Sequence, residues 1–127
     1  MKKVISIGEA LIDFIPNQKG CELKHVTGFE RVVGGAPANV SAVVSKLGGK
    51  SNFISKLGKD AFGDHIIEIL KDANVNTDYI LRTNKANTGL AFVSLKEDGN
   101  RDFSFYRNPS SDMLLEENEV KKEWFKE

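Results

Sequence analysis

The feature that most constrains the fold is the segment spanning residues 32–47, V-V-G-G-A-P-A-N-V-S-A-V-V-S-K-L. An apolar strand end runs into a glycine pair and then into a helix, whose first turn accommodates Pro37 because the missing N–H is not needed there. Gly48 and Gly49 follow as a helix end. Helical spacing predicts one buried face on this helix, formed by Val40, Val43, Val44 and Leu47.

The start of this helix also predicts a ligand site. Gly34 and Gly35 would let a ligand approach bare backbone, and the free N–H groups of a helix start favour oxygen-rich ligands. Asn39 lies in the first turn, where its amide both donates and accepts hydrogen bonds. These parts suit the floor of a pocket for a small polyol. The alternative is a tight strand-to-helix turn that binds nothing.

Composition narrows the class of protein. The 127 residues are 40% hydrophobic and 28% charged, which is typical of a single soluble globular domain. Eighteen basic residues balance eighteen acidic ones, so neither nucleic acid nor an anionic membrane is an expected partner. The single cysteine, Cys21, excludes an intramolecular disulfide and is typical of a reducing compartment. No apolar run approaches a membrane span, so we expect a cytoplasmic protein.

Alternating strands and helices predict an α/β fold. Strands are expected over residues 3–8, 50–55 and 79–82, with one helix after Pro37 and another after the N-cap residue Asp60. This alternation favours a parallel sheet with crossover helices. The apolar stripe of the second helix is expected to contain Phe62, Ile66, Ile69, Leu70 and Ala73.

Other extended segments are expected to stand apart from that sheet. Residues 10–15 form one strand, and residues 22–33 form a weaker extended region. Residues 88–96 and 101–106 form a hairpin around Asp98-Gly99. A helix is expected from Leu114 onward, and no helix-ending signal precedes residue 127.

The segment G-G-A-P-A-N-V-S at residues 34–41, with Gly48-Gly49 and Gly58, resembles the amino-terminal signature of the PfkB, or ribokinase-like, sugar kinase family. The resemblance covers all 127 residues, although chains of that family are much longer. It implies a partial ribokinase-like fold, in which a Rossmann-like parallel sheet carries a small projecting β-sheet lid. The lid strands would come from about residues 10–33 and 88–106.

The resemblance also implies substrate-binding residues. Asp13 would accept hydrogen bonds from sugar hydroxyls, with Gly34, Gly35 and Asn39 beside it. Phe105 and Arg107 resemble positions that contact substrate in the fructokinase and ketodeoxygluconate kinase branches. The alternatives are a solvated charge at position 13, a core phenylalanine at 105 and a surface arginine at 107.

A second signature of the family, a G-A-G-D-like box that supplies the catalytic base and the ATP side of the site, has no match in these residues. We therefore expect no catalytic, cofactor-binding or metal-binding residue in this chain, and we expect the chain alone to be inactive. The carboxyl-terminal ATP-binding part would be absent. Mg²⁺ and ATP are implied for the full-length enzyme.

Among branches of the family, the tail F-Y-R-N-P-S-S-D-M-L-L looks most similar to bacterial fructokinases. The implied reaction converts D-fructose to fructose 6-phosphate. Other candidate activities are those of 2-keto-3-deoxygluconate kinase, ribokinase and aminoimidazole riboside kinase. A different class, a non-catalytic sugar-binding fragment, stays open. The family also implies a homodimer that forms through the lid sheet.

Overall fold

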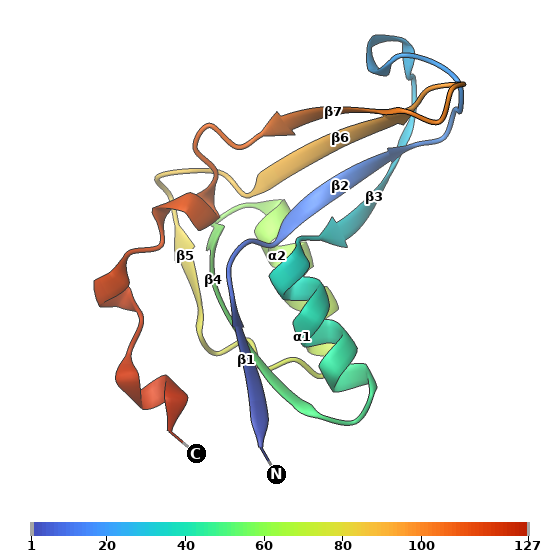
Figure 1. Ribbon diagram of the computed structural model, residues 1–127. Helices are drawn as coiled ribbons and strands as arrows, with labels where there is room; N and C mark the ends of the chain where they lie inside the picture. The colour runs from blue at the N-terminus through green and yellow to red at the C-terminus, as the bar shows by residue number, and fades with distance from the viewer. Residues whose placement is uncertain (1, 127) are drawn as a thin grey trace.

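Two β-sheets and two helices form the protein in a computed structural model that describes residues 2–126. The first sheet is parallel, in the order β1-β4-β5, with β1 at Lys3–Ile7, β4 at Lys50–Gly58 and β5 at Ile80–Thr83. Helices α1 (Ala36–Lys46) and α2 (Ala61–Asp72) lie in the connections between these strands (Figure 1). The predicted α/β fold with crossover helices is confirmed.

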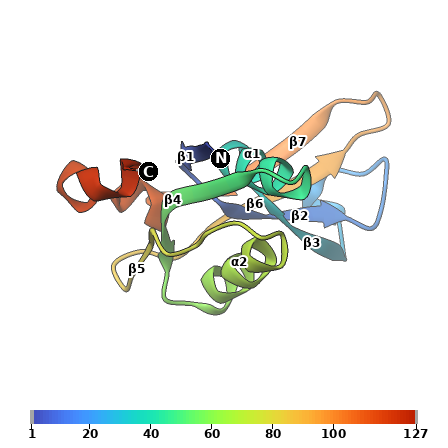
Figure 2. The same ribbon diagram turned by 90° about the horizontal axis from the view of Figure 1, so that it is seen from below.

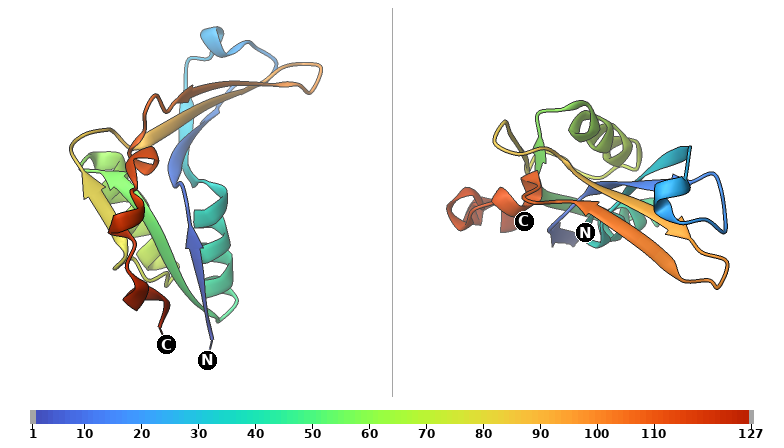
Figure 3. Two further views of the ribbon diagram at one scale, coloured as in Figure 1. Left: turned by 60° about the vertical axis from the view of Figure 1, so that its left-hand side comes forward. Right: turned by 90° about the horizontal axis from the view of Figure 1, so that it is seen from above.

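The second sheet has four strands in the order β3-β2-β6-β7. Its strands are β2 (Leu11–Pro16), β3 (Phe29–Gly34), β6 (Gly89–Leu95) and β7 (Arg101–Tyr106). Strands β2 and β6 are parallel, whereas the two outer pairs are antiparallel. Figures 2 and 3 show this sheet projecting to one side of the helices and the carboxyl-terminal segment lying on the other side.

The hydrophobic core joins the two sheets through α2. Phe53 and Leu57 of β4 and Ile66 of α2 are fully buried in one cluster with Ile12 of β2. Phe14, from β2, extends this cluster. Its ring stacks on Phe92 with centroids 4.6 Å apart and meets Phe62 of α2 edge-on at 5.9 Å. Such aromatic pairs stabilise the packing beyond the area they bury, so the four-stranded sheet is fixed to α2.

The buried face of α1 differs from the prediction. Val40, Val43 and Leu47 are exposed, and Leu47 retains 83% of its accessible surface. The residues that face the parallel sheet are instead Ala38, Ser41 and Ser45. Small side chains let the helix approach the strands closely, and their hydroxyls are paired within the core. The contacts are Ser41 with Ser6, and Ser45 with Ser51 at 2.6 Å.

Two turns lie in direct contact where α1 begins. Gly35, the N-cap residue, has φ of 102°, and a Cβ placed there would lie 2.5 Å from the carbonyl oxygen of Glu9. In return, a Cβ on Gly8 would lie 2.6 Å from Cγ of Pro37. The β1–β2 turn and the β3–α1 turn can therefore touch only because both glycines lack side chains.

Asp60 links the start of α2 to Thr88, which directly precedes β6. As predicted, it caps the helix by accepting a hydrogen bond from the Gly63 N–H at 2.8 Å. Its carboxylate also accepts from the backbone N–H and the hydroxyl of Thr88, at 2.9 and 2.8 Å. Burial raises the pKa of Asp60, but these hydrogen bonds and the charge of Arg82 outweigh it, so the pKa lies below its usual value.

The carboxyl-terminal helix predicted from Leu114 is wrong. This segment forms three 3₁₀ turns, at Ser111–Leu114, Glu117–Glu119 and Lys122–Phe125. Contacts with residues distant in the sequence hold it. Lys56 of β4 pairs with Glu119 at 2.8 Å, and Trp124 stacks on Tyr79 at 4.7 Å.

Three smaller differences concern the predicted elements. The extended region over residues 22–33 contains a 3₁₀ turn at Leu23–His25, and β3 begins only at Phe29. Strand β4 continues to Gly58 instead of ending near residue 55. Ile69, which was placed in the buried stripe of α2, is 41% exposed.

Gly35→Ala should destabilise the chain more than Gly48→Ala. Both glycines have positive φ, but a Cβ at position 48 would have no neighbour within 4 Å. Alanine at position 48 should lower the free energy of unfolding by about 1–2 kcal/mol, because of the backbone conformation alone. Alanine at position 35 should lower it further, because its Cβ would also clash with the Glu9 carbonyl. Urea unfolding of both variants measures the difference, and equal losses would contradict the proposed contact between the turns.

Asp60→Asn should remove a pH-dependent part of the stability. The pKa of Asp60 is lower in the folded chain than in the unfolded chain, so its contribution is present above the usual pKa and is lost as pH falls through the folded value. Asparagine also caps helices well. The difference in unfolding free energy between wild type and variant should therefore be larger at pH 7 than at pH 3. The exposed Glu68→Gln on α2 provides the control, and a difference independent of pH would contradict this role.

Candidate functional site

One face of the four-stranded sheet gathers several predicted site residues. The strand register places Val32, Asp13, Ala91 and Phe105 in a single row across β3, β2, β6 and β7. Paired residues in a sheet point to the same side. Two residues further along their strands, Gly34 and Arg107 continue this side. We call the surface that holds Asp13, Gly34, Phe105 and Arg107 the Asp13 face.

The Asp13 carboxylate lies over the Cα atom of Gly34. A Cβ on Gly34 would overlap the carboxylate oxygen, so the absence of a side chain makes room for Asp13. Within residues 2–126 no hydrogen bond reaches this half-buried carboxylate. Burial raises the pKa of Asp13 above its usual value. A partly desolvated carboxylate without a donor is a strong acceptor for the O–H groups of a ligand.

Gly35 has a different environment from Gly34. Its missing side chain faces the backbone of Glu9 and Ala10, not open space. The two members of the predicted pair therefore have different physical reasons for being glycine. Gly34 accommodates the Asp13 side chain, and Gly35 permits the contact between turns.

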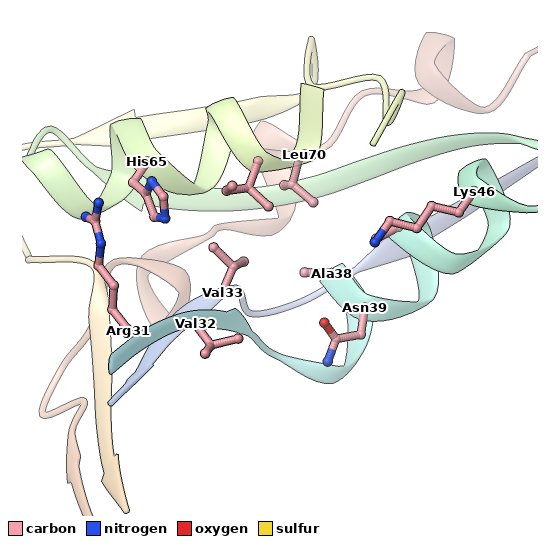
Figure 4. A pocket seen from close by; sticks show the side chains of 10 residues that line it. Arg31, Val32, Val33, Ala38, Asn39, Lys46, His65 and Leu70 are labelled. Carbon is pink, nitrogen blue, oxygen red and sulfur yellow. The ribbon is translucent and has the colours of Figure 1, made fainter. Parts of the chain in front are cut away.

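Asn39 follows the glycine pair and lies in the first turn of α1. Its backbone N–H donates to the carbonyl of Gly35 at 3.0 Å, and the residue is exposed in the first turn of α1. In Figure 4 the Asn39 side chain extends from the first turn of α1, whereas Val33 points from β3 toward α2.

Arg107 follows the end of β7 and is held in place by a partner that the sequence reasoning missed. Its Cγ lies against Gly89, and its guanidinium pairs with Asp112 at 2.6 Å. Asp112 has only 7% of its side chain exposed and also accepts from the Ser110 hydroxyl. The five-residue separation in R-N-P-S-S-D was the available signal for this pair.

Phe105 is exposed and stacks on Phe103, with ring centroids 5.6 Å apart. Phe105 and Arg107 also border a pocket of about 410 Å³ with Thr88 and Asn87. Phe105 is therefore not a core residue. Its ring is available to pack against the C–H surface of a ligand.

The arrangement offers a carboxylate acceptor, an amide, a guanidinium donor and an aromatic surface, which together suit a small polyhydroxylated ligand. Within residues 2–126 no three potential metal ligands lie together. No helix there is long and apolar enough to cross a membrane.

Comparison with known proteins gives consistent matches. The model of the pfkB family of carbohydrate kinases matches residues 1–127. Probable fructokinase-5 of Arabidopsis thaliana is 52% identical over 97% of this chain, which spans 38% of that relative. Two solved structures also match well. One is fructokinase with bound ATP from Xylella fastidiosa, with a TM-score of 0.86 and 42% sequence identity. The match covers 98% of this chain and 39% of the Xylella fastidiosa chain.

The other structure is 2-dehydro-3-deoxygluconokinase from Thermotoga maritima, with a TM-score of 0.88 and 25% sequence identity. The match covers 98% of this chain and 38% of the Thermotoga maritima chain. These neighbours confirm the ribokinase-like architecture. Since the family model matches the whole sequence, the chain belongs to the pfkB family of carbohydrate kinases.

Proposed function

We propose that this chain carries the sugar-binding part of an ATP-dependent fructokinase. The observation that carries the proposal is the Asp13 face. There a partly desolvated carboxylate, which has no hydrogen-bond partner within residues 2–126, lies beside Gly34 and in the same row of the sheet as the exposed ring of Phe105. D-Fructose presents hydroxyl donors to such a carboxylate and a C–H surface to such a ring. Asn39, Gly35 and Arg107 complete the proposed substrate-binding set.

A neutral sugar fits Arg107 better than an acidic one. An acidic substrate such as 2-keto-3-deoxygluconate would need the guanidinium as a partner for its carboxylate. In the structure that guanidinium is already paired with the buried carboxylate of Asp112. The higher identity to fructokinases than to the deoxygluconokinase supports the same choice. Ribokinase and aminoimidazole riboside kinase activities are the remaining candidates.

Phosphoryl transfer requires a base near the acceptor hydroxyl, a bound nucleotide and charge stabilisation. The ATP bound to the Xylella fastidiosa fructokinase supports ATP as the phosphoryl donor, and we propose that Mg²⁺ accompanies it. The 127 residues contain no G-A-G-D-like segment. We therefore propose that they bind the sugar but do not complete the reaction. A non-catalytic sugar-binding fragment is the second candidate.

The exposed part of the four-stranded sheet supports a homodimer. Ile15, Val32, Phe103 and Phe105 are each at least 39% exposed and lie on the same side as Asp13. Contiguous apolar surface of this kind marks interaction sites. We propose that the sheet acts as a lid over the sugar and pairs with the lid of a second copy.

We also propose a cytoplasmic location, because a single cysteine is typical of a protein in a reducing compartment.

Asp13→Asn should weaken D-fructose binding by about tenfold or more, because a hydrogen bond to a charged acceptor is lost. The variant should not be less stable at pH 7, since burial disfavours the charged form of Asp13 in the folded chain. Calorimetric titration and urea unfolding measure the two effects. The control is Asp102→Asn, a carboxylate on the opposite face of the same sheet. Unchanged affinity in the folded Asp13 variant would contradict the proposed site.

Arg107→Ala should reduce the affinity for D-fructose and for 2-keto-3-deoxygluconate by similar factors. The reason is that its charge is already neutralised by Asp112. Parallel titrations with both compounds test this, and Arg101→Ala at the far end of β7 serves as the control. A loss more than about tenfold greater for the acid would instead identify Arg107 as a carboxylate partner and favour an acidic substrate.

A further inference from the structure

A second pocket, of about 350 Å³, lies between β3, α1 and α2. Figure 4 shows that Val33 and Leu70 point into it from β3 and α2, and Ala38 lies beside them on α1. Ala42 and Ile69 add further apolar surface. A pocket of this size is at the small end of the range for ligand sites.

Three basic side chains border this apolar floor. They are Arg31 of β3, Lys46 of α1 and His65 of α2, and no acidic residue lines the pocket. Within residues 2–126 none of the three forms an ion pair or a side-chain hydrogen bond, although other basic residues, such as Lys56 and Arg82, are paired. The whole chain has a formal net charge of zero, so this cluster is a local excess of positive charge.

The basic groups are divided between the two ends of the pocket. Figure 4 shows Arg31 and His65 together at one end and Lys46 at the other, with Val33, Ala38 and Leu70 between them. We infer that the pocket binds a small organic dianion, in which two carboxylate or phosphate groups are separated by a short hydrocarbon chain. One acidic group would lie between Arg31 and His65, and the other would meet Lys46.

The lining of this pocket favours an anion over a neutral sugar. A polyol needs acceptors as well as donors. Apart from His65, whose ability to accept depends on its tautomer, the Asn39 amide is the single side-chain acceptor among the lining residues. The arrangement also differs from the Asp13 face, where the central group is a carboxylate. The inference therefore does not rest on the proposed kinase function. Asn39 lines this pocket and also belongs to the proposed substrate-binding set.

The test is calorimetric titration of the purified chain at pH 7 with malonate, succinate, glutarate and adipate. Butyrate serves as the singly charged probe, and inorganic phosphate as the compact anion. We expect at least one dicarboxylate to bind about tenfold more tightly than butyrate and phosphate. Arg31→Gln and Lys46→Gln should each lower that affinity by about tenfold, since each removes one charge-assisted contact.

Lys96→Gln in the β6–β7 loop is the matched control and should leave binding unchanged. Arg31 and Lys46 are exposed, so their variants should fold, and circular dichroism verifies this. The inference is overturned if no dicarboxylate binds at millimolar concentration. It is also overturned if phosphate binds as tightly as every dicarboxylate, or if Lys96→Gln weakens binding as much as Lys46→Gln.

Discussion

The contact between the β1–β2 turn and the β3–α1 turn determines how the rest of the structure is arranged. The ring of Pro37 lies where a side chain on Gly8 would be, and the carbonyl of Glu9 lies where a side chain on Gly35 would be. Each turn therefore fills the space left by a glycine in the other turn. This contact fixes the direction in which β2 leaves the parallel sheet. It also places the first turn of α1 at the edge of the four-stranded sheet.

The same geometry explains the chemistry of the Asp13 face. Gly34 lacks a side chain where the carboxylate of Asp13 lies, and the sheet register places Phe105 in the same row. Within residues 2–126 no donor reaches the Asp13 carboxylate, and its partial burial therefore costs stability. In the proposed site, the hydroxyl groups of a bound sugar would offset this cost. Arg107, by contrast, is already satisfied by Asp112.

Local patterns in the sequence were sufficient for much of the fold. Alternating strands and helices, the Asp60 cap and the Asp98-Gly99 hairpin depend on neighbouring residues, and the structure confirms them. The predicted buried face of α1 was wrong, because helical periodicity identifies an apolar stripe but not the surface against which the helix packs. Close packing there favoured Ser41 and Ser45 over larger valines.

Long-range contacts were the second feature that the sequence patterns did not predict. The pairs Lys56–Glu119 and Tyr79–Trp124 hold the last residues in 3₁₀ turns, and no local pattern indicates them. For the site, the resemblance named Asp13, Gly34 and Phe105, and the register places them on one face. It could not separate Gly34, which faces Asp13, from Gly35, which faces backbone. The roles of these residues in sugar binding stay predictions.

The most direct measurement combines fructose binding and turnover on the same purified 127-residue chain. Saturation-transfer NMR would detect D-fructose, and a coupled assay with Mg²⁺-ATP would detect ADP release. The account predicts saturable fructose binding without fructose-dependent ADP release. Absence of binding by a folded chain would contradict the Asp13 site. Fructose-dependent ADP release would show that a catalytic base lies within these residues, contrary to the proposed division of the site.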